Sequence, residues 1–244
     1  MVLYYIGLSC LSINDYKKAE RNSILSAEAR RILSILADTT INCIDDAIAT
    51  DENGRPFFKN ANNMDFNISH SGAAAAVSLV QGQNIHGGKI RTGCDIQLIR
   101  PRKNLKGIAE ENFSAAERDY ILSQDETQFE YSRFFQIWTL KECYIKLRGL
   151  SVFDMSKVPS FISRDAAGRH IFAFNADDSL PLSFYLYELT YAGEQYMLAT
   201  AIEGGDGISP EIRIFTPDAQ NHVLRTIVKK NILQYDIQEN HEAK

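Results

Sequence analysis

The sequence is poor in the features that mark several classes of protein. It has only four cysteines, which are widely spaced and form no C-x-x-C pair: Cys10, Cys43, Cys94 and Cys143. This usage argues against a zinc site or a disulfide scaffold and is typical of a reducing compartment. No apolar run approaches the roughly 20 residues that a membrane span requires. The N-terminus, M-V-L-Y-Y-I-G-L, also lacks the cationic region of a signal peptide. We therefore expect a cytoplasmic protein with no membrane partner.

Positively charged residues are also fewer than negatively charged ones. The 26 Lys and Arg residues are outnumbered by 31 Asp and Glu residues, which gives a net charge of −5. Because phosphate backbones require clustered positive charge, we do not expect nucleic acid as the main partner. A local basic pocket for a small phosphorylated ligand remains open. The 244 residues, 45% of them apolar, are enough for one large domain or two small ones with a substantial core.

Helical and strand periodicities are mixed along the chain. Apolar spacing and turn residues predict helices over 15–37, 114–122 and 128–148, and strands over 66–80, 93–99, 183–191 and 195–202. The second helix begins with a capping box, because Glu117 follows Ser114 by three residues. Strict alternation of strands and crossover helices is not seen, so the pattern favours an α+β fold over a doubly wound sheet.

The stretch F-N-I-S-H-S-G, residues 66–72, is the first candidate site. His70 is flanked by two hydroxyls at the end of a predicted strand, which is a compact donor set for a phosphate. The alternative is a strand end whose polar side chains satisfy local backbone groups. A catalytic Ser69–His70 pair is a third interpretation, but adjacent strand residues point to opposite faces, so direct activation is geometrically poor.

The stretch G-C-D-I-Q, residues 93–97, is the second candidate. Asp95 and Gln97 are two apart on a predicted strand, so both side chains emerge from one face. A carboxylate between apolar neighbours is costly unless it is paired or bound to a cation. Mg²⁺ suits such a place, because it takes one or two carboxylates together with water and phosphate oxygens. A structural hydrogen bond is the alternative for this short motif.

The stretch W-T-L-K-E-C-Y-I-K, residues 138–146, is the third candidate and contains the only tryptophan. Trp138, Glu142 and Lys146 follow one another at single turns of a predicted helix, while Lys141 is rotated by about 100° from Glu142. One interpretation is an ordinary surface ion pair between Glu142 and Lys146 at i,i+4. The other is a site that needs one negative and two positive groups.

Taken together and in this order, the three motifs resemble the 4′-phosphopantetheinyl transferase superfamily, specifically its longer, surfactin-synthetase-activating type. F-S-A-A-E at 113–117 and the G-R-P turn at 54–56 fall where that family has F-x-x-x-E and G-K-P. The resemblance runs from about residue 20 to 200. It implies two similar α+β halves, 1–92 and 93–244, related by pseudo-twofold symmetry with the active site in the cleft between them.

The resemblance also implies a reaction. Phosphopantetheine would move from coenzyme A to a serine of an apo acyl or peptidyl carrier protein, with release of 3′,5′-ADP. A monomer is expected, because two fused halves already form the cleft. Asp95, Glu142 and Lys146 would be the catalytic residues. Asp95 and Glu142 would hold Mg²⁺, with Mn²⁺ as an alternative ion, and Glu142 or a hydroxide on the metal would be the general base.

The remaining implied contacts are with coenzyme A. Residues expected to meet its phosphates are Arg21, Arg55, Ser69, His70, Lys141 and Lys146. Gln97 stands where many relatives have a third acidic residue, so its amide oxygen or a water would complete the metal shell. A basic rim for the acidic carrier protein is expected at Arg100, Arg102, Lys103 and Lys106, with a solvated loop as the alternative.

Two other functions remain open beside the transferase. Gln97 allows a catalytically weak relative that binds coenzyme A or a carrier protein without transfer. A Mg²⁺-dependent phosphohydrolase that removes the arm from a holo carrier protein would need an activated water. Product analysis separates the three, because the products would be a holo carrier, an unchanged carrier or free phosphopantetheine.

Overall fold

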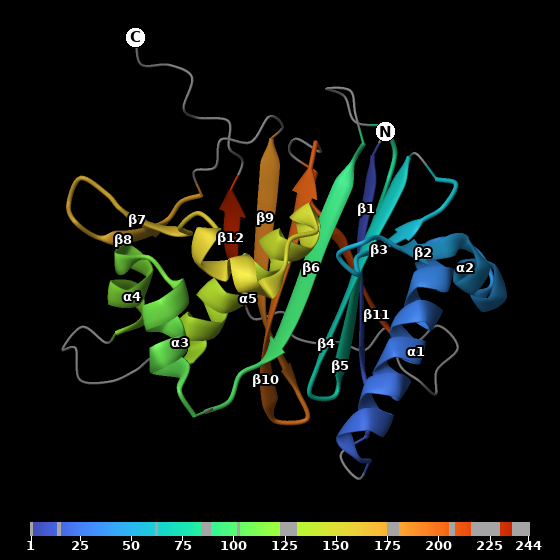
Figure 1. The fold of residues 1–244 in the computed structure, drawn as a ribbon, viewed down its shortest axis with the longest axis horizontal. Helices are drawn as coiled ribbons and strands as arrows, with labels where there is room; N and C mark the ends of the chain where they lie inside the picture. Colours follow the sequence, from blue (N-terminus) through green and yellow to red (C-terminus); the bar gives the residue numbers. More distant parts are fainter. Residues whose placement is uncertain are drawn as a thin grey trace.

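The computed structural model describes residues 2–13, 16–61, 63–83, 89–101, 103–122, 131–174, 181–204, 208–215 and 230–235. Two four-stranded sheets stand side by side in the middle of the molecule, and helices lie on either flank (Figure 1). This mixture of strands and helices confirms the predicted α+β class. None of the helices in the described ranges is both long and apolar enough to cross a membrane.

The first sheet is built mainly from the N-terminal part of the chain. Its strands in spatial order are β11 (Glu211–Phe215), β1 (Leu3–Cys10), β5 (Ala74–Gln81) and β4 (Met64–Ser71). Strand β11 returns from the far end of the chain and pairs in parallel with β1. The Ala-rich run 73–76 passes into β5 and lies in the core, as the extended pattern predicted.

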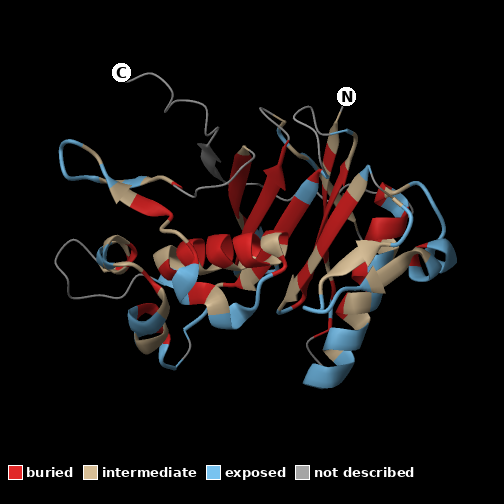
Figure 2. Cartoon of the chain, turned by 45° about the horizontal axis from the view of Figure 1, so that its top comes forward, coloured by how far each residue is buried: buried red, intermediate tan, exposed pale blue. Residues whose placement is uncertain are grey.

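Helix α1 (Lys18–Leu36) covers one face of the first sheet. Its buried apolar residues recur at helical spacing and pack on β5, which confirms the helix predicted over 15–37. Figure 2 shows this buried stripe with the exposed side of α1 turned to solvent. The short helix α2 (Ile41–Ala47) follows, and then the hairpin of β2 (Ile48–Thr50) and β3 (Pro56–Phe58).

The second sheet carries the longest hairpin. Its strands in spatial order are β12 (Lys230–Tyr235), β9 (Leu182–Tyr191), β10 (Glu194–Glu203) and β6 (Arg91–Leu98). Helix α5 (Tyr131–Arg148) packs on it and is buried almost all round, which is typical of a central helix. Smaller elements cover α5: α3 (Leu105–Asn112), α4 (Ala115–Ile121), η1 (Val152–Lys157), β7 (Ile162–Arg164) and β8 (His170–Phe172).

Three apolar clusters hold these layers together. One lies between α1 and the first sheet, and another between α5 and the second sheet. The third joins residues of both sheets, including Ile6, Cys94 and Leu198. The capping box of α4 is present, since Ser114 Oγ accepts from the Glu117 N–H and Glu117 accepts from the Ser114 N–H. Gly149 ends α5 with a positive φ of 66°, as expected for a helix C-terminus.

Candidate active site

A cavity of about 570 Å³ opens where the edge strands β4 and β6 meet. It receives side chains from α1, the β2–β3 hairpin and β4 on one side, and from β6 and α5 on the other. The polar and charged lining residues are Ser26, Arg30, Thr50, Ser69, His70, Asp95, Gln97, Glu142 and Lys146. The structure therefore brings all three sequence motifs into one place. We call this cavity the cleft.

Close packing of α5 on β6 explains how two of the motifs meet. Gly93 lies directly beneath the helix, where a Cβ atom would stand 2.4 Å from the backbone oxygen of Cys143 and 2.9 Å from Cβ of Leu147. Real side chains do not tolerate such distances, so only glycine lets the helix approach this strand. The approach sets Glu142 and Lys146 against Asp95, two residues along the strand from Gly93.

Asp95 is the centre of the hydrogen-bond network in the cleft. Its side chain is almost fully buried, at 1% exposure. Lys146 Nζ lies 2.7 Å from Asp95 Oδ1, and Ser69 Oγ donates to the same oxygen at 2.8 Å. Gln97 Nε2 donates to the other oxygen, Oδ2, at 3.0 Å. Lys146 therefore pairs with Asp95 on the strand beneath its helix, which differs from the simple surface pair with Glu142 considered above.

Glu142 is the least compensated acid of the group. No described residue donates a hydrogen bond to it. Burial and the neighbouring Asp95 raise the pKa of Glu142 to about 7, while Lys146 opposes this shift. Burial by itself would lower the pKa of Lys146, but Asp95 and Glu142 outweigh it and raise the pKa above the ordinary value. Lys146 is therefore a fixed positive charge, and Glu142 is the group able to take up a proton near neutral pH.

The donor set fits a divalent cation. Asp95 and Glu142 are two carboxylates that repel each other and share a single ammonium group. Within the described part of the chain, no set of three or more His, Cys, Asp or Glu side chains is arranged to hold a metal ion. Gln97 points its amide nitrogen at Asp95, which leaves its amide oxygen as an available ligand. Two carboxylates and an amide oxygen, together with phosphate oxygens, are suitable ligands for Mg²⁺.

His70 lines the cleft from β4. It is half-buried, and burial followed by the charge of Lys146 lowers its pKa. On α1, Ser26 and Arg30 line the cleft one turn apart, and Arg30 makes an exposed ion pair with Asp45 at 3.4 Å. Sequence reasoning missed Arg30. The available signal was its place at the edge of the apolar stripe of the helix.

Arg21 does not join these residues. It is nine residues before Arg30, which places it about 180° away around the helix, and it is not among the residues that line the cleft. Arg30, and not Arg21, lines the cleft, so the expected contact of Arg21 with coenzyme A stays a prediction.

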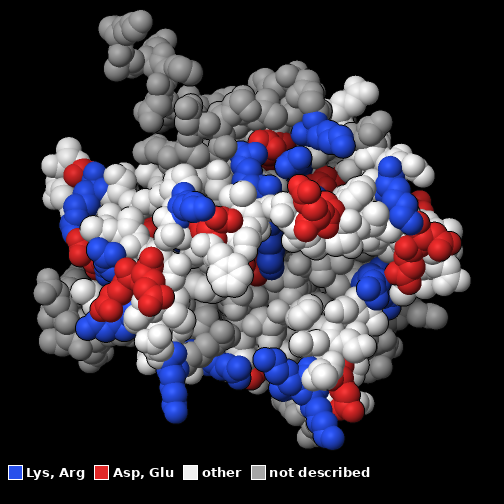
Figure 3. All heavy atoms as spheres, viewed as in Figure 1, with Lys and Arg blue, Asp and Glu red and all other residues white. Residues whose placement is uncertain are grey.

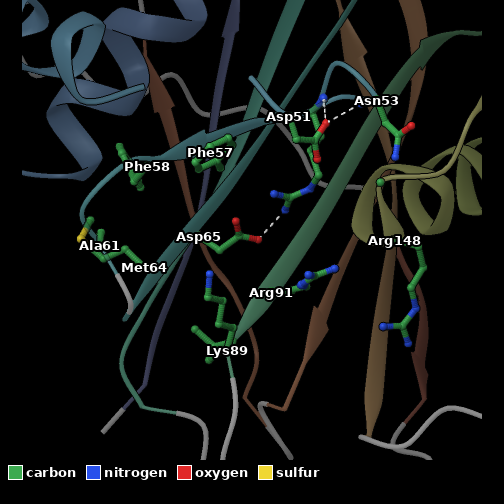
Figure 4. Close-up of a pocket in the computed structure, with 13 residues that line it drawn as sticks. Asp51, Asn53, Phe57, Phe58, Ala61, Met64, Asp65, Lys89, Arg91 and Arg148 are labelled. Carbon is green, nitrogen blue, oxygen red and sulfur yellow. Dashed lines mark hydrogen bonds and ion pairs between the residues drawn. The ribbon is translucent and has the colours of Figure 1, made fainter. Parts of the chain in front are cut away.

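Arg55 lies in a second cavity of about 220 Å³, although its neighbours Gly54 and Pro56 line the cleft. Its guanidinium pairs with Asp65 at 2.5 Å, and its Nε donates to the backbone oxygen of Lys146 at 3.0 Å. Figure 4 shows Asp65 with Lys89 and Arg91 at this cavity. In the structure Arg55 ties the hairpin to β4 and to the end of α5 and does not itself line the cleft, so its expected contact with a coenzyme A phosphate stays a prediction.

Lys141 is also placed away from the cleft. It is 1% exposed and points to the opposite side of α5, where Nζ lies 3.2 Å from Glu117 Oε2 and donates to the Val158 carbonyl at 3.0 Å. Glu117 is itself fully buried and accepts from the Ser114 and Phe161 N–H groups. This corrects the expectation that Lys141 contacts phosphate, because the buried pair holds α4 and the start of β7 against α5.

The predicted basic rim follows β6. Arg100, Lys103 and Lys106 are exposed on the loop and the first turn of α3, while Arg102 lies outside the described residues. Over the face drawn in Figure 3, basic and acidic side chains are interspersed, with basic ones gathered along its lower edge.

Comparison with known proteins shows which family the second half of this site resembles. Residues 91–201 match the model of the 4′-phosphopantetheinyl transferase superfamily. The 4′-phosphopantetheinyl transferase AcpT of Salmonella typhi is 34% identical over 109 residues, which are 45% of this chain and 53% of that relative. The 4′-phosphopantetheinyl transferase psf-1 of Bacillus pumilus is 34% identical over 117 residues, or 48% of this chain and 46% of that relative.

A longer but more distant match is the 4′-phosphopantetheinyl transferase pptA of Paxillus involutus, which is 22% identical over 171 residues, 64% of this chain and 63% of the relative. The chain spans about half the length of the first two relatives. These matches confirm the resemblance seen in the motifs, and the similarity to the 4′-phosphopantetheinyl transferase superfamily extends over residues 91–201. The matched segment contains β6 and α5, and so it includes Asp95, Gln97, Glu142 and Lys146.

Proposed function

We propose that this chain is a 4′-phosphopantetheinyl transferase that moves the phosphopantetheine arm of coenzyme A to a serine of an apo carrier protein and releases 3′,5′-ADP. The observation that carries the proposal is the convergence of Asp95, Glu142 and Lys146 with His70 in one cleft of about 570 Å³. A cavity of this size is within the usual range for small-molecule and cofactor sites.

The charges in the cleft suit the chemistry. Phosphoryl transfer asks the protein mainly for positioning and for neutralising the charge on the phosphate oxygens. Lys146 supplies a permanent positive charge at the centre, while His70 and Arg30 offer donors for phosphate at the side of the first sheet. When bound by Asp95, Glu142 and Gln97, Mg²⁺ would add a divalent charge on the pyrophosphate, and Mn²⁺ has the same ligand preference.

The nucleophile comes from the partner, so the protein needs a base rather than a serine or cysteine of its own. Glu142 is suited to this role, since in the metal-free cleft burial and Asp95 raise its pKa to about 7, so it can exchange a proton near neutral pH. The carrier serine would enter beside Glu142, and the carboxyl group would hold the proton as the bond to phosphorus forms.

The partner and architecture follow the same proposal. Each sheet has a hairpin (β4–β5 and β9–β10) and one long helix against it (α1 and α5), which supports the proposal of two related halves, 1–92 and 93–244, although β11 returns from the second half to the first sheet. Because one chain would then supply both halves, we also propose a monomer. Exposed Arg100, Lys103 and Lys106 would face the acidic surface of an acyl or peptidyl carrier protein. The compartment proposed is the cytoplasm, where carrier proteins and coenzyme A are available.

Intact mass spectrometry tests the proposed reaction. An apo acyl carrier protein and an apo peptidyl carrier protein are each incubated with the chain, coenzyme A and Mg²⁺. We expect a gain of one phosphopantetheine arm on at least one carrier, and no gain with EDTA. An unchanged carrier despite coenzyme A binding would support the binding-only relative that Gln97 suggests. Loss of the arm from a holo carrier would instead support the hydrolase.

Gln97 gives a separate prediction about the metal. Gln97→Glu adds a third carboxylate ligand, so we expect Mg²⁺ to bind about tenfold more tightly in a calorimetric titration, because the number of charged ligands tunes affinity. Without metal the variant loses the donor to Asp95 and gains a repulsive charge, so its Tm is expected to fall. Gln195→Glu is the matched control, since Gln195 is exposed on β10 and outside the cleft. Equal effects of the two substitutions would contradict a role of Gln97 at the metal.

A further inference from the structure

The two sheets are joined at their edges by side chains rather than by backbone pairing. Every second residue of β4 accepts a hydrogen bond from the N–H of every second residue of β6. The four bonds are Thr92 to Asp65 (2.8 Å), Cys94 to Asn67 (3.2 Å), Ile96 to Ser69 (3.2 Å) and Leu98 to Ser71 (3.0 Å). We call this set the side-chain ladder. The period of two puts all four side chains on the side of β4 that faces β6.

The side-chain ladder explains the polar pattern of this strand. An edge strand has unpaired N–H groups that must find acceptors when it is buried. Short polar side chains at 65, 67, 69 and 71 provide these acceptors and keep the two strands in a fixed register, with a constant offset of 27 residues between partners. The motif N-I-S-H-S is therefore partly a structural device that aligns β4 with β6.

Ser69 differs from the other members because its hydroxyl has two further partners. It accepts from the Ile96 N–H at 3.2 Å and from Lys146 Nζ at 2.9 Å, and it donates to Asp95 Oδ1 at 2.8 Å. A serine hydroxyl has one donor and two acceptor lone pairs. All three are used by the protein, and the side chain is 5% exposed. No hydrogen-bonding capacity of Ser69 is left for a phosphate.

We propose that Ser69 is a positioning residue, which holds Asp95 and Lys146 in their places in the cleft, and that it does not itself bind the phosphates of coenzyme A. The hydroxyl and the Lys146 ammonium group both contact Oδ1 of Asp95, and Oδ2 accepts from Gln97 Nε2, so Ser69 helps to fix the orientation of the carboxylate. Its neighbour His70, which also lines the cleft, is then the residue of this motif that would contact the phosphates. The expected changes in kcat and KM rest on the proposed transferase function, whereas the expected change in metal affinity does not.

Ser71 provides a matched control. It makes the same kind of bond, accepting from the Leu98 N–H at 3.0 Å, and it does not line the cleft. Ser69→Ala and Ser71→Ala each remove one bond of the side-chain ladder and leave one buried N–H without its acceptor. Both should lower Tm, and Ser69→Ala should lower it further because it also removes the hydrogen bonds to Asp95 and Lys146. A change in metal binding or catalysis that Ser71→Ala does not share arises from those two contacts.

The experiment measures Mn²⁺ affinity by electron paramagnetic resonance and the steady-state kinetics of carrier modification. Loss of a group that orients a metal ligand typically weakens metal binding or activity by about 10–100-fold. We expect a loss of this size in Mn²⁺ affinity and in kcat for Ser69→Ala, with an unchanged KM for coenzyme A. Ser71→Ala should keep wild-type values, and His70→Ala should raise KM for coenzyme A.

Two results would overturn the inference. Equal Mn²⁺ affinities of the two serine variants would show that Ser69 is only one more bond of the side-chain ladder. A rise in KM for coenzyme A in Ser69→Ala that matches His70→Ala, with intact Mn²⁺ affinity, would make Ser69 a direct ligand. If the wild-type chain modifies no carrier, the proposed function fails, and the Mn²⁺ comparison still decides the role of Ser69.

Discussion

Glu142→Gln is expected to lower the rate of carrier modification by about 10²–10⁴-fold, the range that a positioned general base contributes. The substitution keeps the shape of the side chain and removes both its charge and its basicity. It also leaves Asp95 as the single carboxylate for the metal. The rate is measured by intact mass spectrometry of an apo carrier protein at saturating coenzyme A. An activity within threefold of wild type would exclude Glu142 as the base.

The pH dependence of the wild-type rate gives an independent check. Since burial and Asp95 raise the pKa of Glu142 to about 7, the carboxyl group is protonated below that pH and can neither accept a proton nor hold a cation. At low Mg²⁺ the rate should rise as the pH increases through about 7, and higher Mg²⁺ should move this midpoint to lower pH. The residual rate of Glu142→Gln should lack this transition. Coenzyme A affinity of the variant, measured without metal, is the control for an intact cleft.

Much of the cleft could be predicted from local patterns. The period of two on a strand places Asp95 and Gln97 on one face, and helical spacing places Glu142 and Lys146 one turn apart. Both patterns hold in β6 and α5. Gly93 is the residue that converts these separate patterns into one site, because its missing side chain lets the helix lie against the strand. A glycine two residues before a polar strand position can therefore indicate close packing of another element on that strand, and not only a turn.

The roles of individual cations could not be predicted in this way. Periodicity gives the direction of a side chain relative to its own helix, but it does not say which element lies there. Lys141 and Lys146 both lie close to Glu142 in sequence, yet one meets buried Glu117 and the other meets Asp95. Arg21 and Arg30 likewise share α1 but face different sides. Long-range packing decides these partners, and short motifs contain no information about it.

The buried pair of Lys141 and Glu117 leads to the largest expected effect on stability. Lys141→Met is expected to reduce the free energy of unfolding by about 3–5 kcal/mol, because it leaves Glu117 as an uncompensated charge in the core. Both side chains are at most 1% exposed. Burial lowers the pKa of Lys141, although Glu117 partly opposes this, so the pair already carries a desolvation cost. Urea denaturation at constant pH measures the loss.

Lys157→Met is the matched control for that loss. Lys157 also pairs with an acid, Asp154 at 2.7 Å, but its side chain is 77% exposed, so solvent screens the pair and removing it should change stability little. A measurement of coenzyme A affinity then distinguishes the two roles considered for Lys141, which are contact with phosphate and a structural ion pair. If Lys141 binds a phosphate of coenzyme A, replacing it should lower the affinity for coenzyme A. If Lys141 is structural, replacing it should lower stability and leave that affinity unchanged at denaturant concentrations below the unfolding transition. We expect the second result, because the Lys141 ammonium group points away from the cleft, toward Glu117 and the Val158 carbonyl.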